Sequence, residues 1–377
     1  MSEPIRVLHV IGSMNRGGAE AMIMNLYRHT DHSQVQFDFV ENSSEPAAFD
    51  EEIIKLGGRI YRCPHYNGKN HRVYVKWWND FFKAHPNQYQ IIHGHLGSTA
   101  AIYLAIAKKF GIYTIAHSHN SGTDRGAKTL LYKVMSYNTR NVADYFFACS
   151  TPAGIDRFGN KIVRGGHYSL LNNAIETDTF GYRDSVREIF RQQLGLADEL
   201  VIGHVGRFNP QKNHPFLLNI FAALLKKEPN AVLLLVGGGA DMPKTQAKAQ
   251  ELGIAEHVRF LGVRSDVADL MQAMDVFVFP SLYEGLPVTM VEAQASGLPC
   301  IISDKVPPEC ILTDGLVNIM PLSASPEAWA EKILSMRAVP RTDRHEEIAA
   351  HGFDISTEAV KLQEFYIKSV EEHKLCQ

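Results

Sequence analysis

Hydrophobic and polar positions alternate along this chain in a repeating order. Short apolar runs rich in β-branched and aromatic residues are separated by stretches in which apolar residues recur every three or four positions. The first pattern is typical of buried strands and the second of amphipathic helices. In the first half, strands are predicted at residues 6–11, 34–40, 59–61, 91–93, 113–116 and 145–150, and helices at 20–28 and 99–110. Such alternation predicts a parallel sheet with helices on both faces.

The same pattern begins again in the second half, where strands are predicted at residues 200–205, 231–236, 257–260, 276–279 and 299–302. Turn-forming residues between 170 and 178 mark a linker. We therefore expect an α/β protein with two doubly wound, Rossmann-like domains, 1–172 and 173–355. A terminal helix at 356–377 is expected to cross back to the first domain. Open parallel sheets bind ligands at the carboxyl ends of their strands, so a cleft between the two domains is the expected site.

Composition narrows the class of protein. With 377 residues, 45% of them hydrophobic and 21% charged, the chain has the values of a globular protein and not of a disordered one. Its five cysteines are widely spaced and include no CxxC pair, which argues against a disulfide framework or a zinc finger and favours a reducing compartment. Neither a signal peptide nor an apolar stretch of about 18 to 20 residues is apparent. We expect a cytoplasmic protein without a nucleic-acid partner.

Charge is distributed unevenly. Residues 1–172 hold 19 Lys and Arg against 13 Asp and Glu, or +6, and the remainder holds 19 against 28, or −9. Either this is ordinary solvated surface, or the first half faces an anion such as a phosphorylated acceptor or a lipid headgroup. The aromatic residues between 74 and 82 suit peripheral contact with the inner membrane surface, although their helical spacing favours a place in the core.

Four loops that follow predicted strands carry unusual residues. The first, residues 12–20, contains Gly17 and Gly18 at a helix start, where backbone N–H groups and the helix dipole favour an anion. The second, residues 206–213, places Arg207 and Lys212 five positions apart, which suits a diphosphate. The first loop matches neither the GxGxxG nor the GxxxxGK[ST] fingerprint. For the first loop the alternative is a tight turn with a structural role alone, and for the second it is a pair of solvated cations.

The third loop, residues 279–287, precedes a helix that Pro287 begins. Its Glu284 suits hydrogen bonds from sugar hydroxyls, and Gly285 and Leu286 offer N–H groups. Glu292 lies two turns into the helix and suits ribose hydroxyls. The alternatives are that Glu284 caps the helix and that Glu292 is a surface residue.

The fourth loop, His117-Ser118-His119-Asn120, ends another strand. Its histidines are candidates for substrate hydrogen bonds or base catalysis. Because His93 and His95 close the neighbouring strand in the same way, a four-histidine metal site is an alternative, although these loops contain no carboxylate to complete it.

Together these loops resemble glycosyltransferase family 4, the retaining transferases with the two-domain GT-B fold. Glu284 and Glu292 match the family's E-x7-E signature, and Gly206-Arg207 with Gln211-Lys212-Asn213 match its diphosphate-binding segment. Residues 16–20 and 117–120 are similar to its donor and acceptor loops in the N-terminal domain. The resemblance covers nearly the whole chain, with the motifs in the right order.

The resemblance implies a hexosyltransferase that uses a nucleotide-diphosphate sugar, by analogy a UDP-sugar, and a saccharide or lipid-linked saccharide acceptor, as in capsule or exopolysaccharide biosynthesis. Arg207 and Lys212 would hold the diphosphate, Glu284 the sugar and Glu292 the ribose, while His117 or His119 would lie beside the anomeric centre. The implied donor-binding residues are Gly17, Gly18, Arg207, Lys212, Gly237, Gly238, Val263, Glu284, Gly285, Leu286 and Glu292. The implied catalytic residues are His117, Glu284, Arg207 and Lys212.

No D-x-D pair occurs in the chain, so we expect neither a metal ion nor a cofactor in the transfer reaction. Arg207 and Lys212 would then stabilise the leaving diphosphate. By resemblance, the acceptor attacks on the same face through an oxocarbenium-like state, and the domains close around the donor. An NAD- or flavin-dependent oxidoreductase is disfavoured because GxGxxG is missing. A nucleotide-sugar epimerase with this fold and a non-catalytic nucleotide-sugar-binding subunit remain as alternatives.

Overall fold

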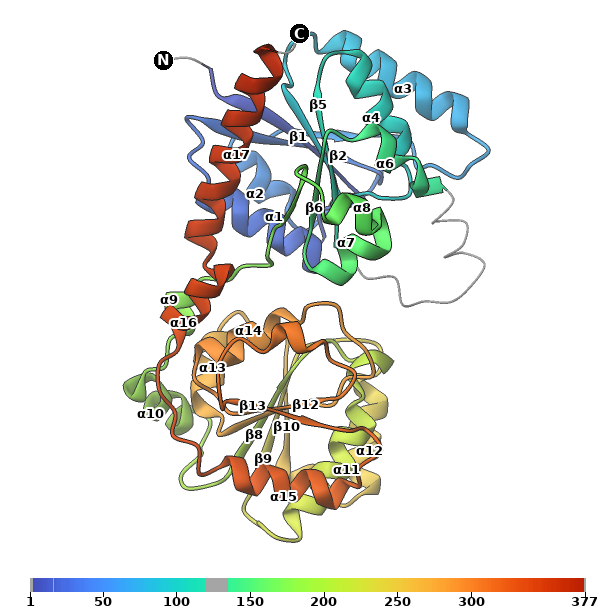
Figure 1. The fold of residues 1–377 in the computed structure, drawn as a ribbon. Coiled ribbons are helices and arrows are strands. Elements are labelled where there is room, and N and C mark those ends of the chain that lie inside the picture. Colours follow the sequence, from blue (N-terminus) through green and yellow to red (C-terminus); the bar gives the residue numbers. More distant parts are fainter. Residues whose placement is uncertain (1–2, 16, 120–134, 376–377) are drawn as a thin grey trace. The chain divides into compact units, whose positions relative to one another are not determined.

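The computed structural model describes residues 3–15, 17–119 and 135–375, which form two compact units. The first unit comprises Met1–Ala174 and Ile355–Gln377, and the second comprises Ile175–Asp354. Their boundaries therefore lie at 174/175 and 354/355, beside the predicted 172/173 and 355/356. The last helix, α17 (Ile355–Leu375), lies with the first unit (Figure 1). Its Leu362, Tyr366 and Val370 are buried in the core of that unit.

The first unit is built on a seven-stranded parallel sheet with the order β3-β2-β1-β4-β5-β6-β7. Its strands are β1 (Ile5–Ile11), β2 (Val35–Glu41), β3 (Ile60–Arg62), β4 (Ile91–Gly94), β5 (Tyr113–Ser118), β6 (Tyr145–Ala148) and β7 (Tyr168–Leu170). The chain proceeds from β1 to one edge and then from β4 to the other, so the strand order reverses between β1 and β4. The short strand β7 was not predicted, and it ends at Leu170, where the predicted linker begins.

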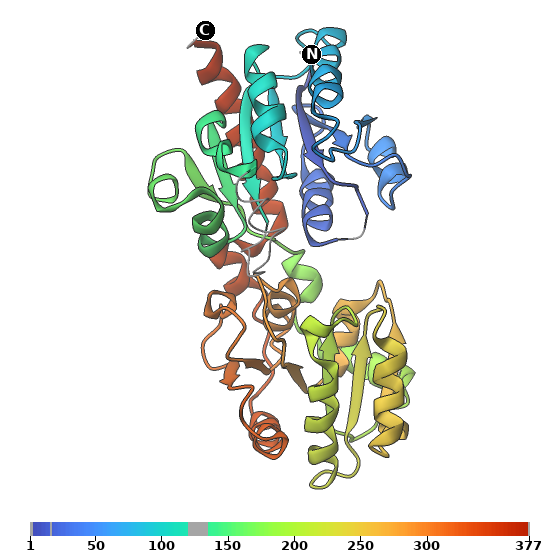
Figure 2. The same ribbon diagram turned by 90° about the vertical axis from the view of Figure 1, so that its right-hand side faces the viewer.

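Helices cover both faces of this sheet (Figures 1 and 2). Besides α17 they are α1 (Gly18–His29), α2 (Asp50–Lys55), α3 (His71–Ala84), α4 (Ala100–Lys109), α6 (Thr139–Val142), α7 (Thr151–Phe158) and α8 (Asn160–Val163). Apolar residues of α1 and α17 pack on one face, and those of α3 and α4 pack on the other. Because both faces are covered, β1 and β2 are buried along nearly their whole length, as their continuous apolar runs predicted.

The aromatic residues of α3 belong to the core. Tyr74, Trp78, Phe81 and Phe82 are buried, and the rings of Trp78 and Tyr103 lie 5.4 Å apart between their centroids. Their three- and four-residue spacing thus marks the buried stripe of an amphipathic helix. These four side chains are not available to a membrane surface.

The second unit has a six-stranded parallel sheet with the order β10-β9-β8-β11-β12-β13. Its strands are β8 (Val201–Val205), β9 (Val232–Val236), β10 (Val258–Gly262), β11 (Val276–Phe279), β12 (Cys300–Ser303) and β13 (Val317–Met320). Here the strand order reverses between β8 and β11. Strand β13 was not predicted, and it pairs with β12 at the sheet edge.

The helices of the second unit also form two layers. They are α9 (Thr177–Phe180), α10 (Asp184–Gln193), α11 (His214–Leu225), α12 (Met242–Glu251), α13 (Val267–Ala273), α14 (Val288–Ala295), α15 (Pro326–Met336) and α16 (His345–Ile348), with short turns η1 (Pro210–Lys212), η2 (Ala255–His257), η3 (Pro308–Cys310) and η4 (Ala349–Phe353). Helices α11 and α15 pack on one face of the sheet, and α13 and α14 pack on the other. Among the helices of the described residues, none has the length and apolarity needed to cross a membrane.

Candidate functional site

The predicted donor loops of the second unit all follow the carboxyl ends of strands in its sheet. Residues 206–213 follow β8, 237–241 follow β9, 263–266 follow β10 and 280–287 follow β11. These four strands are neighbours in the sheet and run in parallel. The loops after β8 and β11 flank the point where the strand order reverses, which is where open α/β sheets bind their ligands.

An ion pair joins the two loops at this reversal point. Lys212 Nζ lies 2.8 Å from Glu284 Oε1, with side chains only 14% and 6% exposed. The same ammonium lies 4.4 Å from the centroid of the Phe279 ring. Gln211 Nε2 donates to the second carboxylate oxygen of Glu284 at 3.0 Å. Two residues that are 72 positions apart in sequence, and that were both predicted to bind the donor, are thus in direct contact.

Further hydrogen bonds fix the conformation of these loops. Leu282 N donates to Gln211 O at 2.8 Å, and Asn213 Nδ2 donates to Pro280 O at 3.1 Å. Asn213 itself adopts a left-handed conformation (φ 57°), which asparagine tolerates better than most residues. Arg207 is exposed on the same loop, beside the buried Phe208. The loop after β8 therefore presents its cations from a rigid backbone.

The glycines after β9 allow two loops to approach each other closely. A Cβ atom on Gly237 (φ 136°) would lie 2.1 Å from Gly206 O, and one on Gly239 (φ 152°) would lie 2.3 Å from Phe208 O. Phe208 N donates to Gly238 O at 2.9 Å. These glycines therefore position the Arg207 loop by backbone packing. Val263, which was predicted near the nucleobase, is exposed.

Helix α14 begins directly after the Glu284 loop. Its N-cap position is Pro287, which has no side-chain cap, so Glu284 does not cap this helix and instead accepts from Lys212 and Gln211. Within the described residues, no group accepts a hydrogen bond from the N–H of Gly285 or Leu286. These two amides precede a helix N-terminus, where the helix dipole favours an anion.

Glu292 lies in the second turn of α14 and is partly buried. Desolvation raises the pKa of its carboxyl from 4.5 to about 7. Within the described residues its side chain has no hydrogen-bond or ion-pair partner. A desolvated carboxyl without a partner is a candidate binding group, because ligand hydroxyls can supply the hydrogen bonds that it lacks.

In the first unit, α1 begins at Gly18 with Gly17 as its N-cap, as the predicted anion site requires. The carboxylate of Glu20 lies over this turn, since a Cβ on Gly17 would be 2.2 Å from Glu20 Oε2. A donor phosphate could reach these amides only if Glu20 turned away. The loop is anchored by Glu41, a fully buried residue that accepts from Met14 N at 2.7 Å and that sequence analysis missed.

Five histidines gather at the carboxyl ends of β1, β4 and β5. Sequence analysis singled out four of them, His93, His95, His117 and His119. The fifth, His9 of β1, was missed. His9 Nδ1 lies 3.0 Å from His95 Nε2, and His95 Nδ1 lies 2.8 Å from His119 Nε2. The rings of His117 and His119 stack at 4.1 Å between centroids. We refer to these five residues as the histidine cluster.

Two residues of the predicted loops, Arg16 and Asn120, lie outside the described residues.

Burial makes this cluster neutral. Desolvation lowers the pKa of His9 to about 3 and that of His119 to about 4. It also holds the pKa values of His93, His95 and His117 well below 6.5, and the neighbouring imidazoles add to that effect. Both ring nitrogens of His117 are buried without a partner among the described residues, and His119 is the more exposed of these two.

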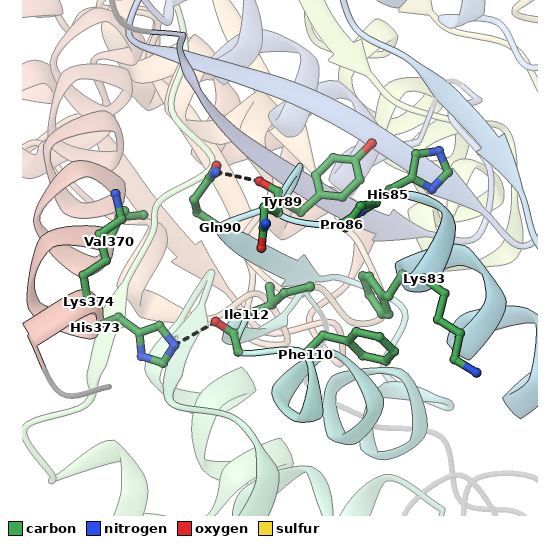
Figure 3. Close-up of a pocket in the computed structure, with 13 residues that line it drawn as sticks. Lys83, His85, Pro86, Tyr89, Gln90, Phe110, Ile112, Val370, His373 and Lys374 are labelled. Carbon is green, nitrogen blue, oxygen red and sulfur yellow. Dashed lines mark hydrogen bonds between the residues drawn. The ribbon is translucent and has the colours of Figure 1, made fainter.

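A pocket of about 520 Å³ lies at the amino ends of strands β4 and β5 in the first sheet. Figure 3 shows it between the residues that precede β4 and β5 and the end of α17, with Lys83, Tyr89 and Phe110 around it. His373 Nε2 is hydrogen-bonded to Gly111 O at 3.1 Å on one side. Because this pocket adjoins the amino ends of the strands, it is not part of the candidate site.

Comparison with known proteins agrees with this arrangement. Residues 16–156 match the family described as Glycosyltransferase Family 4, and residues 186–349 match Glycosyl transferases group 1. The protein EpsF of Bacillus subtilis (strain 168), which carries a provisional assignment as a glycosyltransferase, is 36% identical over 97% of both chains. The UDP-Gal:alpha-D-GlcNAc-diphosphoundecaprenol alpha-1,3-galactosyltransferase of Escherichia coli is 25% identical over 75% of this chain and 76% of its own.

The fold also has solved counterparts. HepE of Anabaena, solved in complex with UDP, superposes with a TM-score of 0.79 at 17% identity, over 97% of this chain and 100% of its own. The same protein with UDP-glucose gives a TM-score of 0.76 at 19% identity, over 97% and 100%. The two doubly wound units, the two family matches and the relative that is 36% identical over 97% of both chains lead to one conclusion: this chain belongs to the family 4, group 1 glycosyltransferases of the GT-B type.

Proposed function

We propose that this glycosyltransferase moves a hexosyl group from a UDP-sugar to a saccharide or lipid-linked saccharide, with retention of configuration and without a metal ion in the transfer step. The observation that carries this proposal is the Lys212–Glu284 pair at the reversal point of the second sheet. It brings a cation for the diphosphate and a carboxylate for sugar hydroxyls into contact on two ordered loops.

Donor binding follows from the groups around this pair. An ammonium has three N–H donors, so Lys212 can keep its hydrogen bond to Glu284 and still donate to a phosphate oxygen. Arg207 on the same loop adds a second, exposed cation, and the N–H groups of Gly285 and Leu286 add neutral donors. Glu292 accepts from the ribose hydroxyls. The UDP and UDP-glucose complexes of HepE, which shares this fold, support a uridine donor.

Transfer then depends on stabilising the departing diphosphate. Fixed cations and amides carry out this role because they are already oriented before the sugar–phosphate bond breaks. A departing phosphate held on one face of the sugar can take the proton of the incoming hydroxyl on that same face, which retains the configuration. The name of the E. coli relative supports an acceptor carried on a lipid diphosphate.

A donor panel tests the first half of this proposal. UDP-glucose, UDP-galactose, UDP-GlcNAc, GDP-mannose and, as a control, NADH are titrated against thermal unfolding of the full chain in EDTA. One UDP-sugar should raise the midpoint, and Arg207→Ala should remove that shift. Arg337→Ala is the matched control, because Arg337 is exposed at the end of α15 and pairs with Glu228. A shift with NADH alone, or with no donor, would refute the proposal.

Transfer and stereochemistry need a second assay. The donor selected by the panel is incubated in EDTA with a GlcNAc-diphospho-lipid acceptor, and the new linkage is assigned by NMR. We expect an α-linked product from an α-linked donor. A β-linked product would contradict retention, and loss of transfer in EDTA would contradict metal independence. Conversion of the donor sugar to an epimer, with no transfer, would instead identify an epimerase.

A further inference from the structure

The histidine cluster of the first unit has a geometry that the transfer reaction does not explain. His9 and His93 are paired in register on β1 and β4, and His95 follows β4 directly. One ring nitrogen of each lies within 4.8 Å of those of the other two. The three come from the two strands between which the strand order of this sheet reverses, which is a binding position in open α/β sheets.

Several ring nitrogens in the cluster are buried without a partner. Among the described residues, His9 Nε2 and His93 Nε2 have no hydrogen bond. The other nitrogen of His93, Nδ1, lies 2.6 Å from Tyr366 Oη of α17. If His93 Nδ1 carries the proton and donates it to Tyr366, the lone pair of Nε2 is left for a ligand. Metal-binding histidines are typically oriented in this way by a hydrogen bond to their second nitrogen.

The donor set of the cluster also suits a metal ion. Metal ions bind neutral imidazole, and His9 and His93 are buried. If His9 carries its proton on Nε2 and His95 carries its proton on Nδ1, the facing nitrogens His9 Nδ1 and His95 Nε2 both keep a free lone pair. Their separation of 3.0 Å is close to the roughly 3.3 Å between two ligand atoms on tetrahedral zinc. Three nitrogen ligands without a carboxylate suit zinc-type ions and not Mg²⁺ or Ca²⁺, which prefer oxygen.

We propose that His9, His93 and His95 bind one divalent transition-metal ion of the zinc type, with a solvent molecule or anion in its fourth position. His95 is partly exposed while His9 and His93 are buried, so the ion enters from the side of His95. The three ligands lie in the first unit, whereas the proposed diphosphate-binding cations Arg207 and Lys212 lie in the second.

Cobalt spectroscopy on untagged full-length protein tests this site, since a polyhistidine tag would bind the same ions. The protein is treated with EDTA, dialysed and titrated with Co²⁺, whose visible absorption reports tetrahedral nitrogen coordination, and Zn²⁺ is then added to displace it. We expect saturation at one ion per chain. His95→Gln should abolish the signal. Tyr366→Phe, which keeps the ring but removes the hydroxyl near His93, should weaken binding roughly 10-fold.

Two further histidines serve as matched controls. His117→Gln changes the cluster outside the three ligands, and His65→Gln changes an exposed histidine of the same unit. Both variants should bind Co²⁺ as the wild type does. Absence of saturable binding in the wild type would overturn the proposal, whatever the folding of the variants. Binding that survives in His95→Gln, or that is lost in His117→Gln, would overturn this choice of ligands.

Discussion

Replacing Glu292 with glutamine should make the protein more stable and at the same time a weaker donor binder. The side chain lies in the second turn of α14, where burial raises the pKa of its carboxyl to about 7. A carboxyl whose folded-state pKa is raised keeps its proton more tightly when folded. Its contribution to stability is therefore fully present below pH 4.5 and is lost as pH rises through 7. Above pH 7 the folded protein contains a desolvated carboxylate, which Glu292→Gln removes.

The size of this effect follows from the shift. The rise of the carboxyl pKa from 4.5 to about 7 corresponds to roughly 3 kcal/mol at pH 8. This is an upper bound, since the glutamine amide must also be desolvated. At pH 5.5 only the interval from 4.5 to 5.5 contributes, which leaves about 1 kcal/mol. For a unit of this size, 1 kcal/mol corresponds to roughly 2–4 °C in the unfolding midpoint.

Calorimetry at pH 5.5 and pH 8 measures the first half of this prediction on the transition of the second unit. Glu292→Gln should raise that midpoint by several degrees at pH 8 and by less than half as much at pH 5.5. The same variant should bind the UDP-sugar about 10-fold more weakly at pH 8, because hydrogen bonds from ribose to a carboxylate are lost. A destabilised variant at pH 8, or a stability change independent of pH, would refute the desolvation argument. Unchanged donor affinity would remove Glu292 from the binding site.

Two more substitutions test the loops of the second unit. Lys212→Met or Glu284→Gln alone leaves one member of a nearly buried pair without its partner and should lower the free energy of unfolding by about 3 kcal/mol. The double variant should lose about 1–3 kcal/mol less than the sum in denaturant titrations, and additive losses would argue against a direct interaction. Gly237→Ala forces a Cβ to within 2.1 Å of Gly206 O and should destabilise by roughly 2 kcal/mol or more. Gly285→Ala, whose Cβ meets no atom within 4 Å, is the control, and equal melting of these two variants would contradict the close approach.

Much of the fold is readable from the sequence because parallel strands buried on both faces give continuous apolar runs. Strands β1, β8 and β9 are buried along most or all of their length and were predicted within one or two residues. Strands β7 and β13, which lie at sheet edges and are only partly buried, were missed, whereas the edge strands β3 and β10 were predicted. An edge strand receives packing on fewer sides, so its composition carries a weaker signal.

The candidate site was predictable as a set of loops but not as a set of contacts. Lys212 and Glu284 were each singled out, yet nothing in the sequence indicates that they form an ion pair. Gln211 was noted within a motif but without a role, although it accompanies Lys212 on Glu284. His9 escaped notice because it lies inside an apolar strand. Its register with His93, which puts it into the histidine cluster, is a property of the assembled sheet.

The two sheets place different chemistry at equivalent positions. In each unit the strand order reverses at one point, between β1 and β4 in the first and between β8 and β11 in the second. At the second point an ammonium and a carboxylate meet, 2.8 Å apart and nearly buried. At the first point imidazoles meet in the part of the chain that the structure describes, and burial lowers their pKa values. We therefore expect an anionic diphosphate to gain more from charge at the second point than at the first. The first point instead favours ligands that accept from or donate to neutral nitrogen, which include sugar hydroxyls and the metal ion proposed above.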